Sequence, residues 1–177
     1  MIRIAYIGNM SLSYDLATAI YAVKGDGEMS LDLAGAGPDE AVLRRRAAGC
    51  DRIRFHGYLD ERKLRALLAA ADVGLVPMFD DSCVGVPYKL ADYAVAGLPV
   101  ASSLQGETAD LLARYEAGVT YPAGDVAALQ KAVRTAAGKT AADGRPAVSM
   151  RRGAAALAKL FDAEKLYEGY VAFAVAL

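Results

Sequence analysis

The residues with the clearest chemical potential are Lys89 and Asp92, in a short segment between Pro87 and Gly97. Proline is favoured at the first position of a helix and glycine just past the last, so this segment is predicted to be helical. A lysine in the first helical turn opposes the macrodipole at a cost of about 0.3–1 kcal/mol, and such a conflict is expected where an anion binds. A phosphate there would meet free backbone N–H groups, the helix dipole and the Lys89 ammonium together.

Asp92 lies one turn deeper in the same predicted helix, about 4.5 Å along its axis from Lys89. Its carboxylate could accept hydrogen bonds from a ribose attached to that phosphate, so the two residues would form half of a nucleotide site. The alternative is an ordinary surface pair, since a Lys and an Asp at this spacing stabilise a helix by roughly 0.2–0.5 kcal/mol. The spacing alone leaves both interpretations open.

The composition limits the classes of protein to consider. With 177 residues, 55% hydrophobic and 23% charged, the chain is typical of a single packed domain. We expect a core over residues 1–138 and a helical tail over 145–177, joined by a polar, Gly- and Pro-containing linker. A net charge of −1 provides no basic field for nucleic acid. The single histidine excludes a multi-histidine metal site, and two cysteines give no disulfide framework.

No segment carries a targeting or membrane-spanning pattern. The amino terminus, MIRIAYIG, has the pattern of a strand rather than of a signal peptide, and the terminal run VAFAVAL is too short to span a bilayer. We therefore expect a cytoplasmic protein.

Strand and helix patterns alternate from end to end. Apolar β-rich runs predict strands at residues 2–7, 30–34, 52–55, 73–77, 98–102 and 118–121. Helices are predicted at 14–23, 39–48, 61–70, 107–115 and 125–137, with a helical tail from 147 that breaks near 161–162. Short connections in this rhythm predict an α/β, Rossmann-like doubly wound parallel sheet. Ligands bind such sheets at the carboxyl ends of the strands, where the loops 8–13, 35–38, 56–58 and 79–87 are expected.

Other motifs in these loops carry weaker signals. The sequence Gly35-Ala36-Gly37 lacks the third glycine of a dinucleotide fingerprint and has Glu40 there, which argues against a nicotinamide or flavin site. We interpret it as a tight turn with room for the backbone to approach a ligand. The loop 9–13 could donate to phosphate or, as we favour, cap the next helix.

Four further side chains in or near the loops have a chemical and a structural interpretation. His56 could act as a base, and Asp80 and Asp81 could hold a metal, but we favour a structural histidine and solvated carboxylates. We expect Cys83 to be a small buried hydrophobic residue. No Ser-His-Asp arrangement can be built with one histidine so placed.

Five motifs occur together in a recognisable order. They are Tyr6-Ile7-Gly8, Gly35-Ala36-Gly37-Pro38, Phe55-His56-Gly57-Tyr58, Ala70-Ala71-Asp72-Val73 and Asp92-Tyr93-Ala94-Val95-Ala96-Gly97-Leu98-Pro99-Val100-Ala101. In this order and spacing, over residues 2–135, they resemble the C-terminal, donor-binding domain of GT-B glycosyltransferases of the group 1 family.

The resemblance implies a donor-nucleotide site. Asp92 would bind the ribose hydroxyls, and the loop with Gly57 and Tyr58 would approach the base. Gly8 and Asn9 would lie close to the diphosphate. The start of the helix, with Val86, Pro87 and Lys89, would complete the site.

Two departures from the family pattern bear on the chemistry. Val84 stands where the first glutamate of the usual Glu-x7-Glu pair is expected, and the first loop lacks the usual Arg and Lys. A subgroup with the pattern P-x-K-x-x-D is similar to residues 87–92, and there the lysine would supply the charge for the phosphate. The missing glutamate leaves the retaining mechanism and the sugar open.

The resemblance also implies that this chain is one half of an enzyme. The N-terminal acceptor domain, which usually carries the catalytic base, would be absent, so we expect no catalytic residue, metal or cofactor in this chain. The whole enzyme would move a sugar from UDP- or GDP-sugar to a glycan or lipid-linked acceptor, with possible peripheral contact to a membrane. The helical tail would reach the absent domain and expose apolar surface.

Two other functions are compatible with the same pattern. One is a non-catalytic nucleotide-binding module that acts through a partner chain. The other is a flavodoxin-like signalling domain, which is disfavoured because no acidic cluster follows the first strand.

Overall fold

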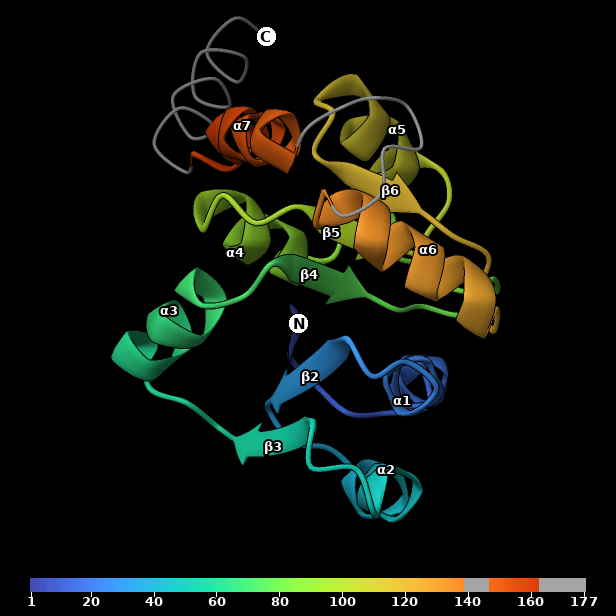
Figure 1. Ribbon diagram of the computed structural model, residues 1–177. Helices are drawn as coiled ribbons and strands as arrows, with labels where there is room; N and C mark the ends of the chain where they lie inside the picture. Colours follow the sequence, from blue (N-terminus) through green and yellow to red (C-terminus); the bar gives the residue numbers. More distant parts are fainter. Residues whose placement is uncertain (139–146, 163–177) are drawn as a thin grey trace, which may run out of the picture.

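Six short, mostly apolar runs form one parallel sheet in the computed structural model, which describes residues 1–138 and 147–162 (Figure 1). The strands are β1 (Ile2–Ile7), β2 (Met29–Ala34), β3 (Ile53–Gly57), β4 (Val73–Val76), β5 (Val100–Ser102) and β6 (Gly118–Thr120). Neighbouring strands are parallel, in the order β3-β2-β1-β4-β5-β6. This order confirms the doubly wound sheet and excludes the flavodoxin-like arrangement, whose strand order is 2-1-3-4-5.

The connecting helices cover both faces of the sheet. They are α1 (Leu16–Lys24), α2 (Glu40–Ala47), α3 (Glu61–Ala69), α4 (Tyr88–Val95), α5 (Glu107–Arg114), α6 (Val126–Ala136), α7 (Ala147–Leu157) and the 3-10 helix η1 (Ala158–Phe161). Helices α1, α2 and α6 lie on one face, on the right of Figure 1, whereas α3 and α4 lie on the other and α7 packs against α4. The observed ends differ from the predicted ones by only one or two residues.

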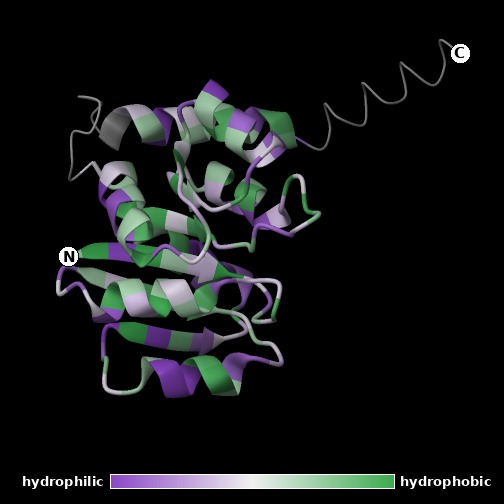
Figure 2. Cartoon of the chain, turned by 90° about the vertical axis from the view of Figure 1, so that its right-hand side faces the viewer, coloured by the Kyte–Doolittle hydropathy of each residue, from purple (hydrophilic) through white to green (hydrophobic). Residues whose placement is uncertain are grey.

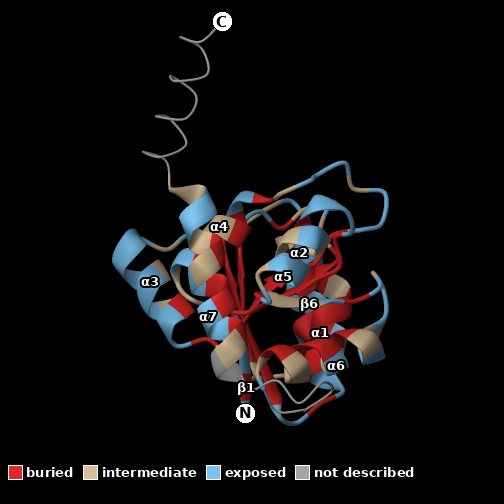
Figure 3. Cartoon of the chain, turned by 90° about the horizontal axis from the view of Figure 1, so that it is seen from above, coloured by how far each residue is buried: buried red, intermediate tan, exposed pale blue. Residues whose placement is uncertain are grey.

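Burial explains why the strands read as continuous apolar runs. All six residues of β2 and all four of β4 are buried, as expected for parallel strands covered on both faces. Green predominates in the central strands of Figure 2, whereas the helices carry both colours. The buried residues form a central layer in Figure 3, and α3 exposes most of its surface.

Capping residues set the helix starts. The side chain of Asp60 accepts a hydrogen bond from the Lys63 amide at 2.8 Å, as an N-cap should, which confirms its predicted role. For α1, however, the cap is Asp15, whose carboxylate accepts from the Thr18 amide. The expectation that the loop 9–13 caps this helix is therefore wrong.

The glycine turn after β2 also differs from its interpretation. Gly35 has a φ of 123°, and a Cβ there would lie 2.0 Å from the Gly8 carbonyl oxygen. A Cβ at Gly37 would lie 2.2 Å from the Met10 carbonyl oxygen. The backbone that approaches these glycines is the chain's own β1–α1 loop, rather than a ligand.

The described part of the tail packs on the body of the domain. Met150, Ala154 and Leu157 of α7 are buried, and the chain leaves η1 at Asp162 in an extended conformation, which agrees with the predicted break. In η1, by contrast, the large apolar side chain of Leu160 is 39% exposed. The predicted linker at 139–146 and the tail from 163 lie outside the described residues.

Candidate functional site

The site begins where the strand order reverses, between β1 and β4. The middle of β1 pairs with the amino end of β4, and further along the Tyr93 hydroxyl bridges the two strands. It accepts a hydrogen bond from the Ile7 amide at 3.2 Å and lies 3.1 Å from the carbonyl oxygen of Leu75 and 3.2 Å from that of Ala5. Tyr93 thus satisfies backbone groups of both strands and anchors α4 at the switch point of the sheet.

Sequence reasoning missed this role of Tyr93. The residue that could have indicated it is Gly74, because a glycine inside an apolar strand often marks a place where another group packs closely on the backbone. A Cβ at Gly74 would lie 2.6 Å from the Tyr93 ring. The glycine therefore lets the ring pack directly on β4.

A pocket of about 560 Å³ lies beside this switch point, within the range of about 300–1,000 Å³ usual for small-molecule sites. Its walls come from the end of β1, the loop before α1, the loop before α4, and α3 and α4. The lining residues are Ile7, Gly8, Tyr14, Leu64, Val84, Val86, Pro87, Tyr88, Lys89 and Asp92.

Five of the eight predicted donor-binding residues line this pocket, namely Gly8, Val86, Pro87, Lys89 and Asp92. Asn9, Gly57 and Tyr58 do not. The Asn9 carbonyl oxygen accepts a hydrogen bond from the Tyr6 hydroxyl, and the Gly57 carbonyl oxygen accepts one from the Gly35 amide at 2.7 Å. The side chain of Tyr58 is 86% exposed at the same edge of the sheet.

The start of α4 departs slightly from the prediction. Pro87 is the N-cap, with an extended conformation (φ −78°, ψ 142°), rather than the first helical residue. Lys89 is consequently the second residue of the helix. At the other end Gly97 follows the cap residue Ala96 with a φ of 62°, the left-handed conformation expected just past a helix.

Lys89 is buried, with only 6% of its surface exposed. Its Nζ lies 3.7 Å from the centre of the Tyr14 ring and 4.7 Å from that of Tyr6, and each ring attracts it by about 0.5–2 kcal/mol. Desolvation by burial lowers the pKa of Lys89 to about 7. A Cβ at Gly8 would lie 3.4 Å from Cε of Lys89, so this glycine gives the lysine room.

Asp92 stands at the outer end of the pocket. Its side chain is exposed and also lines a second cavity of about 550 Å³ between α3, α4 and η1. Partial desolvation raises the pKa of its carboxyl group. Lys89 and Asp92 therefore share the pocket as predicted, but they are not ion-paired with each other.

The loop before α4 is attached to α5. The Thr108 hydroxyl donates a hydrogen bond to the Gly85 carbonyl oxygen, and a Cβ at Gly85 would lie 3.1 Å from Oε2 of Glu107. Asp80 and Asp81 are exposed, as the solvated interpretation predicts. Cys83 is exposed as well, so the expectation of a buried residue is wrong; its loop lies at the rim of the sheet rather than in the core.

His56 belongs to a separate charged cluster on β1, β2 and β3, which we call the Asp32 cluster: Arg3, Asp32, Arg54 and His56. The Asp32 carboxylate accepts two hydrogen bonds from Arg54, at 2.8 and 3.0 Å, and lies 2.7 Å from His56 Nε2. Burial alone would raise the pKa of Asp32, but the bonds from Arg54 and His56 outweigh it and hold that pKa below its ordinary value. This geometry supports the structural interpretation of His56.

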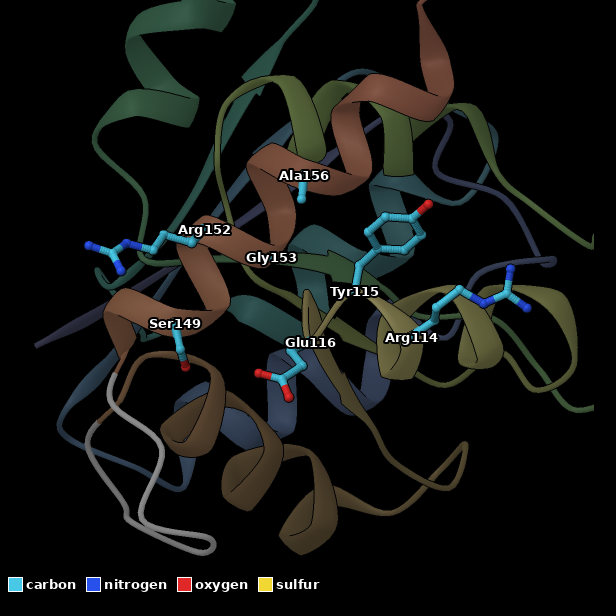
Figure 4. A pocket seen from close by; sticks show the side chains of 7 residues that line it. All are labelled: Arg114, Tyr115, Glu116, Ser149, Arg152, Gly153 and Ala156. Carbon is cyan, nitrogen blue, oxygen red and sulfur yellow. The ribbon is translucent and has the colours of Figure 1, made fainter.

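A further cavity, of about 580 Å³, lies at the opposite, amino edge of the sheet, between α5, β6 and α7 (Figure 4). Arg114 and Arg152 line it but extend away from each other, so they do not converge on one ligand. Gly153 lets α7 pack here, since a Cβ would lie 2.2 Å from the Tyr115 carbonyl oxygen. The convergent chemistry is thus at the carboxyl edge.

The described residues hold neither a cluster of metal ligands nor a membrane-spanning helix. Over residues 1–138 and 147–162, no three His, Cys, Asp or Glu side chains gather as a metal ion would require. In the same ranges, no helix has the length and apolar character needed to cross a bilayer.

Comparison with known proteins assigns a family to this arrangement. The family model described as glycosyl transferases group 1 matches residues 2–139. Phosphatidyl-myo-inositol mannosyltransferase of Mycobacterium leprae is 35% identical over 107 residues, which make up 60% of this chain and 28% of that protein. Glycogen synthase of Mycobacterium tuberculosis is 28% identical over 167 residues, 89% of this chain and 38% of that protein.

Solved structures show the same fold. HepE from Anabaena, in complex with UDP and glucose, superposes with a TM-score of 0.81 at 14% identity, over 99% of this chain and 48% of HepE. The C-terminal domain of the group 1 family protein LpcC from Francisella tularensis superposes with a TM-score of 0.66 at 13% identity, over 90% of this chain and 83% of that domain. The chain thus spans about half of HepE and well under half of its curated relatives.

Proposed function

The chain belongs to the group 1 glycosyltransferases, and we propose that it binds the nucleoside diphosphate of a UDP- or GDP-sugar donor. Its fold is a Rossmann-like half of a GT-B glycosyltransferase. In the whole protein the donor sugar would be transferred to a glycan or a lipid-linked acceptor held by a second domain. The bound UDP of HepE supports a nucleotide-sugar donor, but the base, sugar and acceptor are part of the proposal.

One observation carries the proposal: a buried lysine without an acidic partner lines the switch-point pocket. No salt bridge between described residues includes Lys89, although the side chain is only 6% exposed. Burying a cation without an anion is costly, so natural proteins rarely keep one unless a ligand uses it. The start of α4 adds the positive end of the helix dipole beside the same ammonium.

The pocket gives each part of the donor a place. We assign the diphosphate to Lys89 and Gly8, and the ribose hydroxyls to the Asp92 carboxylate at the outer end. The base would lie toward the exposed Tyr58 and Gly57. When the sugar leaves, negative charge grows on the diphosphate, and Lys89 with the α4 N-terminus would stabilise it electrostatically.

A non-catalytic nucleotide-binding module that acts through a partner chain is the second candidate. Large apolar side chains are exposed near the pocket, on two loops and at the first residue of α4: Leu12 at 83%, Tyr58 at 86% and Tyr88 at 96%. They favour a covering surface at this edge of the sheet. A second glycosyltransferase domain and a separate partner would both fit, and glycosyl transfer by the reconstituted whole protein would decide for the enzyme.

Calorimetric titration of UDP and GDP into the chain tests the binding proposal. We expect saturable binding of one nucleotide, lost in both Lys89→Ala and Asp92→Ala. Lys131→Ala and Asp110→Ala, which remove exposed charges on α6 and α5, are the matched controls and should bind normally. No binding at millimolar nucleotide in a folded sample, or equal loss in the controls, would contradict the assignment.

The isolated chain should bind donor without transferring sugar, because the acceptor would be held by the other half. Incubation with radiolabelled UDP-glucose or GDP-mannose and a mixed glycan acceptor tests this. Transfer above the level of the Lys89→Ala variant would show that the chain is a complete enzyme.

A further inference from the structure

The loop that leads into α4, residues 79–86, is held at both ends by hydroxyl groups of one segment, the stretch from the end of β5 to the start of α5. We call it the α4 loop. Just before it, the Ser103 hydroxyl accepts a hydrogen bond from the Met78 amide at 2.7 Å and donates one to the Met78 carbonyl oxygen at 2.6 Å. Near its end, the Thr108 hydroxyl donates to the Gly85 carbonyl oxygen. Ser103 is 2% exposed and Thr108 is fully buried, so both hydroxyls belong to the packed body of the domain.

Between these two attachments, little else fixes the α4 loop. Of residues 80–85, all of which the structure describes, Gly85 alone is hydrogen-bonded to a segment outside the loop. The Val84 amide donates to the Ser82 hydroxyl at 3.3 Å, which is a bond within the loop. Most side chains of this stretch are exposed, so the core does not hold them either. The position of the loop near its end therefore depends on Thr108.

The α4 loop forms a wall of the switch-point pocket. Val84 and Val86 line that pocket, and Pro87 begins α4 directly afterwards. Val84 also lines a neighbouring cavity of about 360 Å³ between this loop and the β1–α1 loop. Thr108 lines neither cavity, so it can affect them only through the loop that it holds.

We propose that Thr108 is a positioning residue for the donor: its hydroxyl holds Gly85, and with it the pocket wall at Val84 and Val86, in the arrangement that receives the nucleoside diphosphate. This inference rests on the proposed donor site. A wall that is already in place spares the donor the cost of ordering it. Without the hydroxyl the loop would populate other arrangements, and the affinity would fall in proportion to the fraction that stays competent.

Thr108→Val tests the role of the hydroxyl, because valine keeps the branched shape of threonine and cannot donate. A typical protein hydrogen bond shifts such an equilibrium by about 2- to 10-fold. We therefore expect the dissociation constant for UDP or GDP, measured by calorimetry, to rise about three- to tenfold. Thr108→Ser keeps a hydroxyl and should bind within about twofold of the wild type.

Thr135→Val is the matched control. The Thr135 hydroxyl donates to the Lys131 carbonyl oxygen at 3.0 Å within α6, so this change removes the same kind of hydrogen bond away from the loop. It should leave the affinity for UDP and GDP unchanged. In Thr108→Val the exposed Gly85 can be hydrated instead, so its melting temperature should fall by no more than about 4 °C. Affinity is then compared between folded proteins.

A measurement without nucleotide reports on the loop itself. Cys83 is exposed and lies in the α4 loop, so it can carry a nitroxide spin label once the half-buried Cys50 is replaced in Cys50→Ser. The spectrum should show a restricted label in the otherwise unchanged chain and in Thr108→Ser. Thr108→Val should add a mobile component. The affinities are measured on unlabelled protein, so that the label does not disturb the pocket.

The outcomes separate this inference from the donor site. A mobile label and weaker nucleotide binding in Thr108→Val, both restored in Thr108→Ser, would support the proposal. If UDP or GDP binds the wild type and Thr108→Val equally well, or if Thr108→Ser loses as much affinity as Thr108→Val, only this inference fails. If neither nucleotide binds the wild type, the donor site is wrong and the positioning role falls with it, even where the label shows that Thr108 orders the loop.

Discussion

Two buried charges in this protein have opposite surroundings. Asp32, on β2, is 4% exposed and its carboxylate contacts both Arg54 and His56. Lys89, on α4, is 6% exposed and contacts two tyrosine rings. Both pKa values are lowered, with opposite effects on the charge. The lowered pKa of Asp32 favours its ionised form, whereas the lowered pKa of Lys89 favours its neutral form.

The difference distinguishes a structural charge from one available for function. Asp32 has its hydrogen-bond partners within the fold and needs no ligand. Lys89 lacks an ionic partner among the described residues and lies at the carboxyl edge, where a doubly wound sheet binds ligands. We therefore expect substitution of Asp32 to lower stability without changing donor binding. Substitution of Lys89 should weaken donor binding and raise stability.

The largest expected effect is on donor binding by Lys89→Met. Loss of a charge-assisted contact worth about 3 kcal/mol should weaken UDP or GDP binding about 100-fold. The same substitution removes a buried cation and should raise the free energy of unfolding by about 2 kcal/mol. Calorimetry and urea unfolding measure the two effects. Lower stability of Lys89→Met together with unchanged affinity for UDP and GDP would show that Lys89, and not only Asp32, is a structural charge.

The next effect is on stability, in Asp32→Ala. This change leaves Arg54 and His56 without their shared acceptor and should lower the free energy of unfolding by about 2 kcal/mol. The loss stays below the 3–5 kcal/mol of a fully buried pair, because the side chain of Arg54 is 47% exposed and can be hydrated. Urea unfolding measures it, with Asp72→Ala, a partly buried carboxylate that accepts from the Arg3 amide, as the comparison. Donor affinity should not change; a parallel loss of binding would link the cluster to the site.

The smallest expected effect is the change of stability with pH, to which Asp32 and Lys89 each contribute in a different pH range. Asp32 has a folded pKa below its unfolded value of about 3.9, so its contribution is present above that pH and is lost as the pH falls further. Lys89 has a folded pKa of about 7 and an unfolded one of about 10.4, so the unfolded state binds more protons between them. Stability should therefore rise by about 1.5 kcal/mol from pH 7 to pH 8.5.

Unfolding curves of the wild type, Asp32→Asn and Lys89→Met across pH isolate these contributions. The difference between wild type and Asp32→Asn should shrink below about pH 4, and that between wild type and Lys89→Met should shrink above pH 7. A difference that is constant with pH in either variant would show that the charge is not perturbed as described.

Most of the fold followed from local patterns. The alternation of apolar runs and amphipathic stretches predicted the six strands and their connecting helices, and Asp60 was identified as a cap from its residue type alone. The errors at Cys83 and in the loop 9–13 share a cause. Both concern loops, whose burial and contacts depend on what packs against them rather than on periodicity.

The sequence alone determined the α/β class, the family resemblance and the placement of Lys89 and Asp92 on one helix, because strand and helix periods and motif order are properties of neighbouring residues. Only the tertiary structure decided what surrounds Lys89. The strand order brings β1 and its loop against α4, from positions some 80 residues apart in the chain, and so places Tyr6 and Tyr14 around the ammonium. The desolvation that results is a property of the packed pocket, and no spacing along the chain encodes it.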